Sequence, residues 1–251
     1  MSKISVVIIT YNREEYLRKA IDSVLLQDFK DLEIIVVDDG STDNTSSLID
    51  SYKEKGVVIK YKKNDQNLGI VKSRNIALSL SSGEYMAILD SDDFWLDNGK
   101  LRKQFDFLES NKDYGVCGSM AQIININGNN TGDYILVSSD RAIRKKILLS
   151  NQFIHSSVLI RMSILNEVGL YEDYLVGEDY DLFLKIGLVA KLYNIPEKMI
   201  AYRKHSDGIT WKKKSVAAKE HLRIIKKYKG KYPLYFIALI KAYLRIVVSF
   251  F

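Results

Sequence analysis

Three aspartates within four positions, Asp90, Asp92 and Asp93, follow an apolar run at residues 85–89 that has the length of a buried strand. Like charges so close together repel one another and resist burial, so we expect a cation among them. Hard ions such as Mg²⁺ and Mn²⁺ prefer carboxylate oxygens, and Mg²⁺ sites usually combine one or two carboxylates with waters and substrate phosphates. The stretch therefore predicts a site for a metal ion and a diphosphate, the alternative being a solvated acidic turn that caps a helix beginning near Asn98.

Strand-length apolar runs alternate with stretches of helical spacing in the first part of the chain, which predicts an α/β fold with a parallel, doubly wound sheet. The predicted strands in this part are residues 4–9, 33–37, 57–61 and 85–89, and a further strand is predicted later, at residues 199–202. Right-handed crossovers place the carboxyl ends of such strands at one edge, where ligands bind. Polar residues follow three of these strands directly, at 10–12, 38–39 and 90–93, so we expect them to converge in one cleft.

The composition is that of a soluble globular protein, with 47% hydrophobic and 27% charged residues among 251. This length allows one large domain, with or without an appendage. The single cysteine, Cys117, excludes an intramolecular disulfide and a cysteine-based zinc cluster, and it fits a reducing compartment. The apolar run near the N-terminus is too short for the core of a signal peptide. We therefore expect a cytoplasmic protein.

The net charge of +6 is concentrated at the C-terminal end. Residues 212–231 hold nine lysines and arginines against Glu220 alone, and with Lys241 and Arg245 the segment 212–251 carries +10, which leaves −4 for the rest of the chain. A nucleic-acid enzyme is expected to be basic around its active stretch, whereas this chain is acidic there. Nucleic acid is therefore not an expected partner.

The end of the chain, residues 233–251, is apolar apart from Lys241 and Arg245, which makes it marginal for spanning a bilayer. We expect an amphipathic helix that lies in the interface of an anionic membrane, with the preceding lysines on the headgroups. That would hold the protein at the inner face of the cell membrane, close to a lipid-linked acceptor. The alternatives are a helix packed on the domain and a helix in a homodimer interface, and the sequence leaves them open.

Ordered motifs lie at residues 6–13 (VVIITYNR), 37–43 (VDDGSTD), 67–75 (NLGIVKSRN) and 83–93 (GEYMAILDSDD). In this order and spacing they resemble the motifs of family 2 glycosyltransferases, over nearly all of residues 1–110 and again around 155–210. The resemblance implies a GT-A fold, in which helices flank a Rossmann-like, mostly parallel central sheet. It also implies a nucleotide-sugar donor, Mn²⁺ or Mg²⁺, and inversion at the sugar carbon. We expect a glycosyltransferase domain at 1–211, with its nucleotide-binding part at 1–110 and its acceptor and catalytic part at 111–211, and a basic helical tail at 212–251.

The resemblance further implies roles for single residues. Asp39 would accept a hydrogen bond from the uracil ring, whose N3–H is a donor. Arg74 would place a cation near the nucleotide, with a surface helix arginine as the alternative, and Asp90 would face the ribose. Thr10 and Tyr11 would line the base pocket, and Asn12, Arg13 and Ser91 complete the expected nucleotide-sugar-binding set. The expected metal ligands are Asp92, Asp93 and His205, and whether Asp92 or Asp93 binds the ion directly stays open.

Glu178, Asp179 and Asp181 fall in the first turn of a predicted helix, where acids complement the helix dipole. The stretch also resembles the Glu-Asp motif of the family, which implies that Asp179 is the catalytic base. Such a base takes the proton of the acceptor hydroxyl as the new bond forms, and typically contributes about 10²- to 10⁴-fold. We interpret His155 as a structural histidine at the start of a strand, the alternative being a contact with donor or acceptor.

The predicted function is the transfer of a sugar from a UDP-sugar to a hydroxyl of a surface polysaccharide or lipid-linked oligosaccharide. An NAD-dependent oxidoreductase would carry Gly-x-Gly-x-x-Gly after the first strand, and a nucleotidyltransferase would carry a glycine-rich basic loop there. Residues 10–15 contain no glycine. The remaining alternative is a catalytically inactive, membrane-docked subunit that binds a sugar nucleotide.

Overall fold

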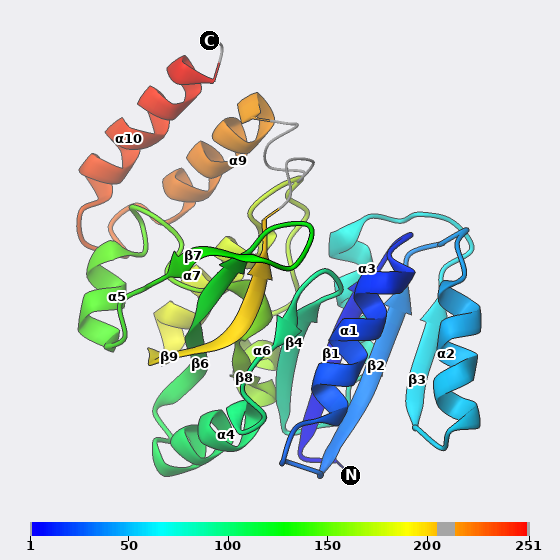
Figure 1. Cartoon of the computed structure of the whole chain (residues 1–251). Helices are drawn as coiled ribbons and strands as arrows, with labels where there is room; N and C mark the ends of the chain where they lie inside the picture. Colours follow the sequence, from blue (N-terminus) through cyan, green and yellow to red (C-terminus); the bar gives the residue numbers. More distant parts are fainter. Residues whose placement is uncertain (1, 205–213, 250–251) are drawn as a thin grey trace.

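Within residues 2–204 and 214–249, which the computed structural model describes, nine strands form one sheet with helices on both faces (Figure 1). The strand order is β3-β2-β1-β4-β8-β6-β9-β5, and β7 pairs with β6. The strands are β1 Ile4–Thr10, β2 Leu32–Asp38, β3 Ile59–Lys63, β4 Tyr85–Asp90, β5 Phe94–Trp95, β6 Tyr114–Ile124, β7 Asn130–Tyr134, β8 Leu159–Arg161 and β9 Lys191–Arg203. The helices are α1 Glu14–Leu25, α2 Thr45–Glu54, α3 Ile70–Leu80, α4 Lys100–Ser110, α5 Asp140–Lys146, η1 His155–Ser157, α6 Met162–Val168, α7 Glu178–Val189, α9 Lys214–Lys227 and α10 Tyr235–Val248.

The N-terminal half of the sheet is parallel, as predicted. β1 pairs in parallel with β2 and β4, and β2 pairs in parallel with β3. The register sets Thr10 opposite Asp38 and Ile9 opposite Asp90, so the carboxyl ends of β1, β2 and β4 lie level at one edge. This edge carries the polar residues that follow the three strands in the sequence.

Both faces of β1, β2 and β4 are buried, which explains why these strands are mostly apolar, whereas the edge strand β3 is largely exposed. Ile4, Val6 and Ile8 of β1 pack with residues of α1, α2 and α4 on one face of the sheet. Val7 and Ile9 pack with residues of α3 and α7 on the other face. Because side chains alternate between the faces of a strand, a central strand needs apolar residues on both faces.

Beyond β4 the sheet becomes mixed. β8 is antiparallel to both β4 and β6, whereas β6 and β9 pair in parallel along most of their length. The strand expected at residues 199–202 is the C-terminal part of the much longer β9. Since Phe94 of β5 lies opposite Ala201, the end of β9 returns Arg203 to the acidic stretch at residues 90–93.

The basic tail folds into two helices, α9 and α10. α9 is packed on the domain: Ile224, Ile225 and Tyr228 belong to the same apolar core as α7, and the Tyr228 hydroxyl donates to Asp181 Oδ1 at 2.9 Å. α10 packs beside α9 at the outside of the molecule (Figure 1). Within residues 2–204 and 214–249, no helix, α10 included, is long and apolar enough to cross a bilayer. The predicted boundary at residue 211 lies outside the described residues.

Candidate functional site

The loops after β1 and β2 meet at the carboxyl edge of the sheet. Asn12 has a left-handed backbone, with φ of 51°, which asparagine tolerates better than most residues. Its Oδ1 accepts a hydrogen bond from the Thr42 N–H at 2.8 Å, and its own N–H donates to the Ser41 hydroxyl at 2.9 Å. Asn12 therefore holds the two loops together. Beside it, Tyr11 is 44% exposed, and Thr10 Oγ1 is buried without a hydrogen-bond partner in the described part of the chain.

Asp39, directly after β2, is buried and strongly hydrogen-bonded. Its Oδ1 accepts from the Asn64 amide at 2.9 Å, the Leu68 N–H at 2.8 Å and the Ser73 hydroxyl at 2.9 Å. Its Oδ2 accepts from the Gly69 N–H at 3.0 Å. A carboxylate oxygen can accept about two hydrogen bonds, so Oδ2 retains capacity for a further donor.

The neighbours of Asp39 shape the loop around it. Gly40 has a φ of +83°, and a Cβ at this position would lie 2.7 Å from the carbonyl carbon of Gln66. Glycine is therefore required where the loop after β3 approaches so closely. Asp38 is a structural residue, since its carboxylate accepts from the Ser41 N–H at 2.8 Å and from the Tyr61 hydroxyl at 2.7 Å.

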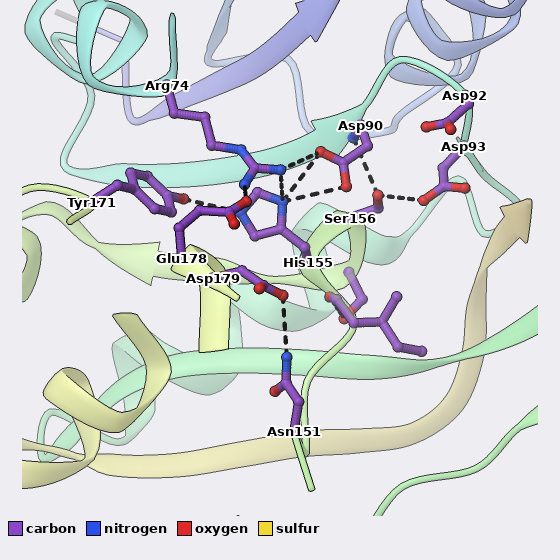
Figure 2. A network of polar contacts seen from close by, with 12 residues as sticks. Arg74, Asp90, Asp92, Asp93, Asn151, His155, Ser156, Tyr171, Glu178 and Asp179 are labelled. Atoms are coloured by element: carbon purple, nitrogen blue, oxygen red, sulfur yellow. Dashed lines mark hydrogen bonds and ion pairs between the residues drawn. The ribbon is translucent and has the colours of Figure 1, made fainter. Parts of the chain in front are cut away.

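The side chain of Arg74, on α3, links the acidic stretch at residues 90–93 to the acidic stretch at residues 178–181, where α7 begins (Figure 2). Its buried guanidinium pairs with Asp90 Oδ1 at 3.0 Å through Nη2 and with Glu178 through Nη1. The His155 ring lies against the same groups, with Nδ1 3.1 Å from Arg74 Nη2 and 3.2 Å from Asp90 Oδ1. Its Nε2 is 3.0 Å from the Tyr171 hydroxyl. One arginine thus joins α3, β4 and the start of α7, and it is not a surface residue.

These contacts fix the charges of Arg74 and Asp90. Burial alone would raise the pKa of the Asp90 carboxyl, but the adjacent His155 and Arg74 outweigh it and hold that pKa well below its ordinary value. Burial alone would lower the pKa of Arg74, but the carboxylates of Glu178 and Asp90 outweigh it and raise that pKa. Asp90 and Arg74 therefore remain an ion pair at neutral pH.

Asp92 and Asp93 are adjacent but lie in different surroundings (Figure 2). Asp93 is buried, and its carboxylate accepts from the Ser156 hydroxyl and from the Arg203 N–H at 2.7 Å. Burial and the neighbouring Asp92 raise the pKa of Asp93 well above its ordinary value. Asp92 is less buried, and its Oδ2 lies 2.6 Å from Nη1 of Arg13. Asp93 therefore fastens the loop to β9, whereas Asp92 faces a cation.

Asp179 lies in the first turn of α7, as predicted. Its Oδ2 accepts a hydrogen bond from the Asn151 amide nitrogen at 3.1 Å (Figure 2). The amide oxygen of Asn151 accepts from the Phe153 N–H at 3.0 Å, so the amide can only present its nitrogen to Asp179. Burial and the adjacent Glu178 raise the pKa of the Asp179 carboxyl above its ordinary value. A carboxylate with a raised pKa is a stronger proton acceptor, which suits a general base.

A continuous chain of contacts connects the predicted donor residues to the helix that carries Asp179. It runs from Asp39 to the Ser73 hydroxyl, along α3 to Arg74, and from there to Asp90 and Glu178. The ends of β1, β2 and β4 therefore lie at one edge of the sheet, as expected, and Arg74 connects this edge to the Glu-Asp stretch, whereas their convergence in one cleft stays a prediction.

Of the expected metal ligands, Asp92 and Asp93 follow β4, and Asp92 lies beside Arg13. Ser91, which belongs to the expected nucleotide-sugar-binding set, is buried directly after β4. His205 lies outside the described residues. Across the two described ranges, no three His, Cys, Asp or Glu side chains are grouped so that they alone could hold a metal ion. Asp92 could therefore contribute to a site that a ligand completes, since Mg²⁺ commonly combines one or two carboxylates with phosphate oxygens.

Sequence reasoning missed two residues of this site, Tyr171 and Asn151. A signal for Tyr171 lies in the motif beside Arg74: the Asn75 amide donates to the Tyr171 carbonyl at 3.0 Å, and its oxygen accepts from the Tyr171 N–H at 3.0 Å. Asn151 belongs to no motif, and only the fold brings it to Asp179. His155 was interpreted as structural, and it is buried as such, but it contacts the two charged groups at the centre of the site.

Comparison with known proteins gives a family match and many relatives. The family model described as glycosyl transferase family 2 matches residues 5–169. An uncharacterized glycosyltransferase of Methanocaldococcus jannaschii is 33% identical over 204 residues, which cover 80% of this chain and 70% of the relative. The Escherichia coli protein WfaP, named a UDP-Glc:alpha-D-GlcNAc-diphosphoundecaprenol beta-1,3-glucosyltransferase, is 29% identical over 245 residues, 90% of this chain and 91% of that protein. Several other relatives are longer, and the chain matches 60% of the length of a protein from Mycobacterium tuberculosis.

Solved structures share the fold. S. aureus TarS in complex with UDP-GlcNAc superposes with a TM-score of 0.73 at 23% identity, over 97% of this chain and 72% of that chain. A mannosyltransferase from Pyrobaculum calidifontis, in complex with GDP-Man and Mn²⁺, superposes with a TM-score of 0.68 at 18% identity, over 98% of this chain and 74% of that chain. These likenesses confirm the predicted GT-A fold.

Proposed function

Because this chain belongs to glycosyl transferase family 2, we propose that it moves a sugar from a UDP-sugar to a hydroxyl group of a saccharide or lipid-linked saccharide. That it is a glycosyltransferase follows from the family. The observation that carries the finer proposal is the double ion pair of Arg74, because it brings the Glu178-Asp179 stretch to the end of the donor strands.

For the donor, Asp39 Oδ2 has room to accept the N3–H of uracil, while the other contacts of the carboxylate hold it in place. Thr10 Oγ1 offers a buried hydroxyl at the same edge, and the exposed Tyr11 ring offers a surface for the base. Asn12 contributes by holding the loops in position. UDP is the nucleotide named for WfaP and bound in the TarS complex, which supports this choice.

For the reaction, Asp179 acts as the general base of an inverting displacement. The acceptor oxygen forms a bond to the anomeric carbon, the bond from that carbon to the diphosphate oxygen breaks, UDP leaves, and the acceptor proton passes to Asp179. Asn151 occupies one side of Oδ2 and orients the carboxylate. The raised pKa of Asp179 favours its acceptance of the proton.

For the metal, the surroundings of the two aspartates favour Asp92 over Asp93 as the direct ligand. Asp93 already receives hydrogen bonds on both oxygens, from Ser156 and from Arg203. The Arg13 guanidinium beside Asp92 supports the proposal that this carboxylate takes a cation. A bound Mn²⁺ or Mg²⁺ would offset the charge of the leaving diphosphate. The Mn²⁺ named for the mannosyltransferase structure supports a divalent ion, and His205 stays a proposed third ligand.

For the acceptor, the relative WfaP supports a lipid-linked saccharide, since its name describes a sugar attached to diphosphoundecaprenol. We therefore place the protein at the cytoplasmic side of the cell envelope.

The test is a panel of UDP-, GDP- and dTDP-sugars, each with and without Mn²⁺, read by thermal unfolding and by release of the free nucleotide in the presence of a GlcNAc-diphosphate-lipid. A ligand at 100 times its Kd stabilises the folded state by about 2.7 kcal/mol, so the preferred nucleotide will stand out. We expect UDP-sugars with Mn²⁺ to raise the Tm most and to turn over. A larger shift with GDP- or dTDP-sugars would overturn the donor assignment, and UDP-sugar binding without turnover on any saccharide acceptor would favour the inactive subunit.

A further inference from the structure

α10 exposes a continuous apolar face to the outside of the molecule. The residues of this face include Phe236, Ile237, Ile240, Leu244, Val247 and Val248, each more than half exposed. We propose that this face, with the basic residues that border it, docks the protein on the surface of an anionic lipid bilayer. The proposal concerns a surface apart from the reaction site, so it does not depend on the donor or on the role of Asp179.

The face is continuous because of helical spacing. At 100° per residue the six residues fall within an arc of about 120° on the helix. The opposite side carries Ala238 and Ala242, which are fully buried and belong to the same core as α9. Small residues on the packed side bring α10 close to α9, and the large apolar residues are left facing outward. A helix stabilised by its packing would show the reverse distribution.

Basic side chains border this face on both sides. Lys241 and Arg245 follow it on one side of the helix, and both are exposed. On the other side lies Tyr243, whose ring centroid is 5.5 Å from the Nζ of Lys226 on α9. An apolar arc flanked by cations, with a tyrosine at its margin, is the arrangement that helices in a membrane interface adopt.

The charge of the tail decides between a bilayer and a second copy of the chain. Residues 212–251 carry +10, with Glu220 as their single acid. A twofold dimer through α10 would bring two such segments together, and their charges would repel. An anionic lipid surface would attract these charges instead, and each lysine or arginine near the surface would contribute roughly 1 kcal/mol to the binding free energy. With only 14 residues, α10 is too short to span the bilayer, so it would lie in the interface.

The experiment is sedimentation of the full chain with vesicles of phosphatidylcholine alone or with 30–50% phosphatidylglycerol (roughly the range in which surface charge is strong). The test variant is Ile240→Ser/Leu244→Ser, which removes two apolar side chains from the centre of the face. The matched control is Leu26→Ser/Val58→Ser, which replaces two apolar residues that are at least as exposed and that precede β2 and β3 at the other end of the sheet. Circular dichroism verifies that each variant is folded.

We expect binding to the anionic vesicles that weakens with salt, a loss of at least ~10-fold in the Ile240→Ser/Leu244→Ser variant, and no change in the control. Arg245→Glu should also weaken binding to anionic vesicles, and circular dichroism verifies that this variant is folded. Equal binding by the two serine variants, or no binding of the wild type to anionic vesicles, would overturn the proposal. So would a concentration-dependent dimer in sedimentation velocity that the Ile240→Ser/Leu244→Ser variant abolishes, since the face would then belong to a second copy.

Discussion

The two acidic stretches of this protein, residues 90–93 and 178–181, are built on the same plan but lie in different surroundings, which fits the different roles proposed for them. Each gives one carboxylate to Arg74: Asp90 from the first stretch and Glu178 from the second. Each then places another carboxylate nearby, Asp92 in the first and Asp179 in the second. A single buried guanidinium therefore pairs with one carboxylate of each stretch and links the two.

What differs is the partner of the second carboxylate. Asp92 lies 2.6 Å from a guanidinium, whereas Asp179 receives a hydrogen bond from a neutral amide. Asp92 thus already offers an oxygen to a cation, which suits a metal ligand. The burial of Asp179 and the adjacent Glu178 instead raise its pKa, which suits a proton acceptor. In the proposed mechanism it is the surroundings, and not the residue type, that divide cation binding from proton transfer.

The largest effect is expected from Arg74→Leu, which removes the guanidinium that pairs with both acidic stretches. It leaves the buried Glu178 and the half-buried Asp90 without the guanidinium, and removing one partner from a buried pair typically costs about 3–5 kcal/mol. The free energy of unfolding, measured in urea, should fall by that amount, and transfer should be lost. Lys72→Leu, an exposed change on the same helix, is the control and should stay within about 0.5 kcal/mol of the wild type. A similar small cost for Arg74→Leu would mean that the network does not hold the stretches together.

Replacing the two neighbouring aspartates separates their roles. Asp92→Asn should weaken Mn²⁺-dependent UDP binding by about 10- to 100-fold, because it removes the carboxylate charge at the proposed metal position. Asp93→Asn should affect Mn²⁺ affinity less and Tm more, because Asp93 ties Ser156 and Arg203 to the loop. Titration calorimetry with UDP at several Mn²⁺ concentrations gives the affinities of the two variants, and thermal unfolding gives their Tm. The reverse ranking would make Asp93 the ligand.

A change at Asn151 sharpens the account of the base. The Asn151 N–H stabilises the ionised form of Asp179, so Asn151→Leu should raise the pKa of that carboxyl further. Since the protonated acid cannot accept a proton, activity rises as the pH rises through this pKa, and the acid limb of the kcat/KM profile should move to higher pH. We also expect kcat to fall about 10-fold at neutral pH with the KM for the donor unchanged. A uniform loss at every pH would assign Asn151 a structural role only.

The smallest effect is expected from Arg13→Gln. The guanidinium neutralises Asp92 and so competes with a metal ion for the same carboxylate. Its removal should tighten binding of Mn²⁺ about two- to five-fold, since exposed pairs contribute up to about 1 kcal/mol. The binding can be measured by the paramagnetic signal of free Mn²⁺. Weaker binding in the variant would indicate that Arg13 holds Asp92 in position or contacts the diphosphate itself.

The strands β1, β2 and β4 could be predicted because they are buried on both faces and are mostly apolar. The second half of the sheet could be predicted only in part. Only residues 199–202 of β9 were predicted as a strand, because its first part contains the polar Asn194. This side chain is buried, and its amide donates hydrogen bonds to the carbonyl groups of Val137 and Gln152. Strands that bury polar groups through long-range hydrogen bonds lose the hydrophobic pattern from which they are recognised.

The residues of the site show the same limit. Asp39, Asp90 and Asp179 could be named because they follow strand ends or begin a helix within recognisable motifs. The contacts of these residues could not be predicted from the sequence. Arg74 and Glu178 are 104 positions apart, and Asn151 contacts Asp179 only in the folded chain. The exposed face of α10 was expected from composition, whereas the packing of α9 on the domain depends on which apolar residues of the tail find partners.

The most direct test of the central claim is Asp179→Asn, assayed separately for donor binding and for transfer. The substitution keeps the size of the side chain and removes its capacity to take a proton. We predict that the Kd for UDP with Mn²⁺ stays within about two-fold of the wild type while transfer falls by about 10²- to 10⁴-fold. Unchanged turnover would remove Asp179 from the mechanism, and a parallel loss of UDP binding would show that it supports the site without acting as the base.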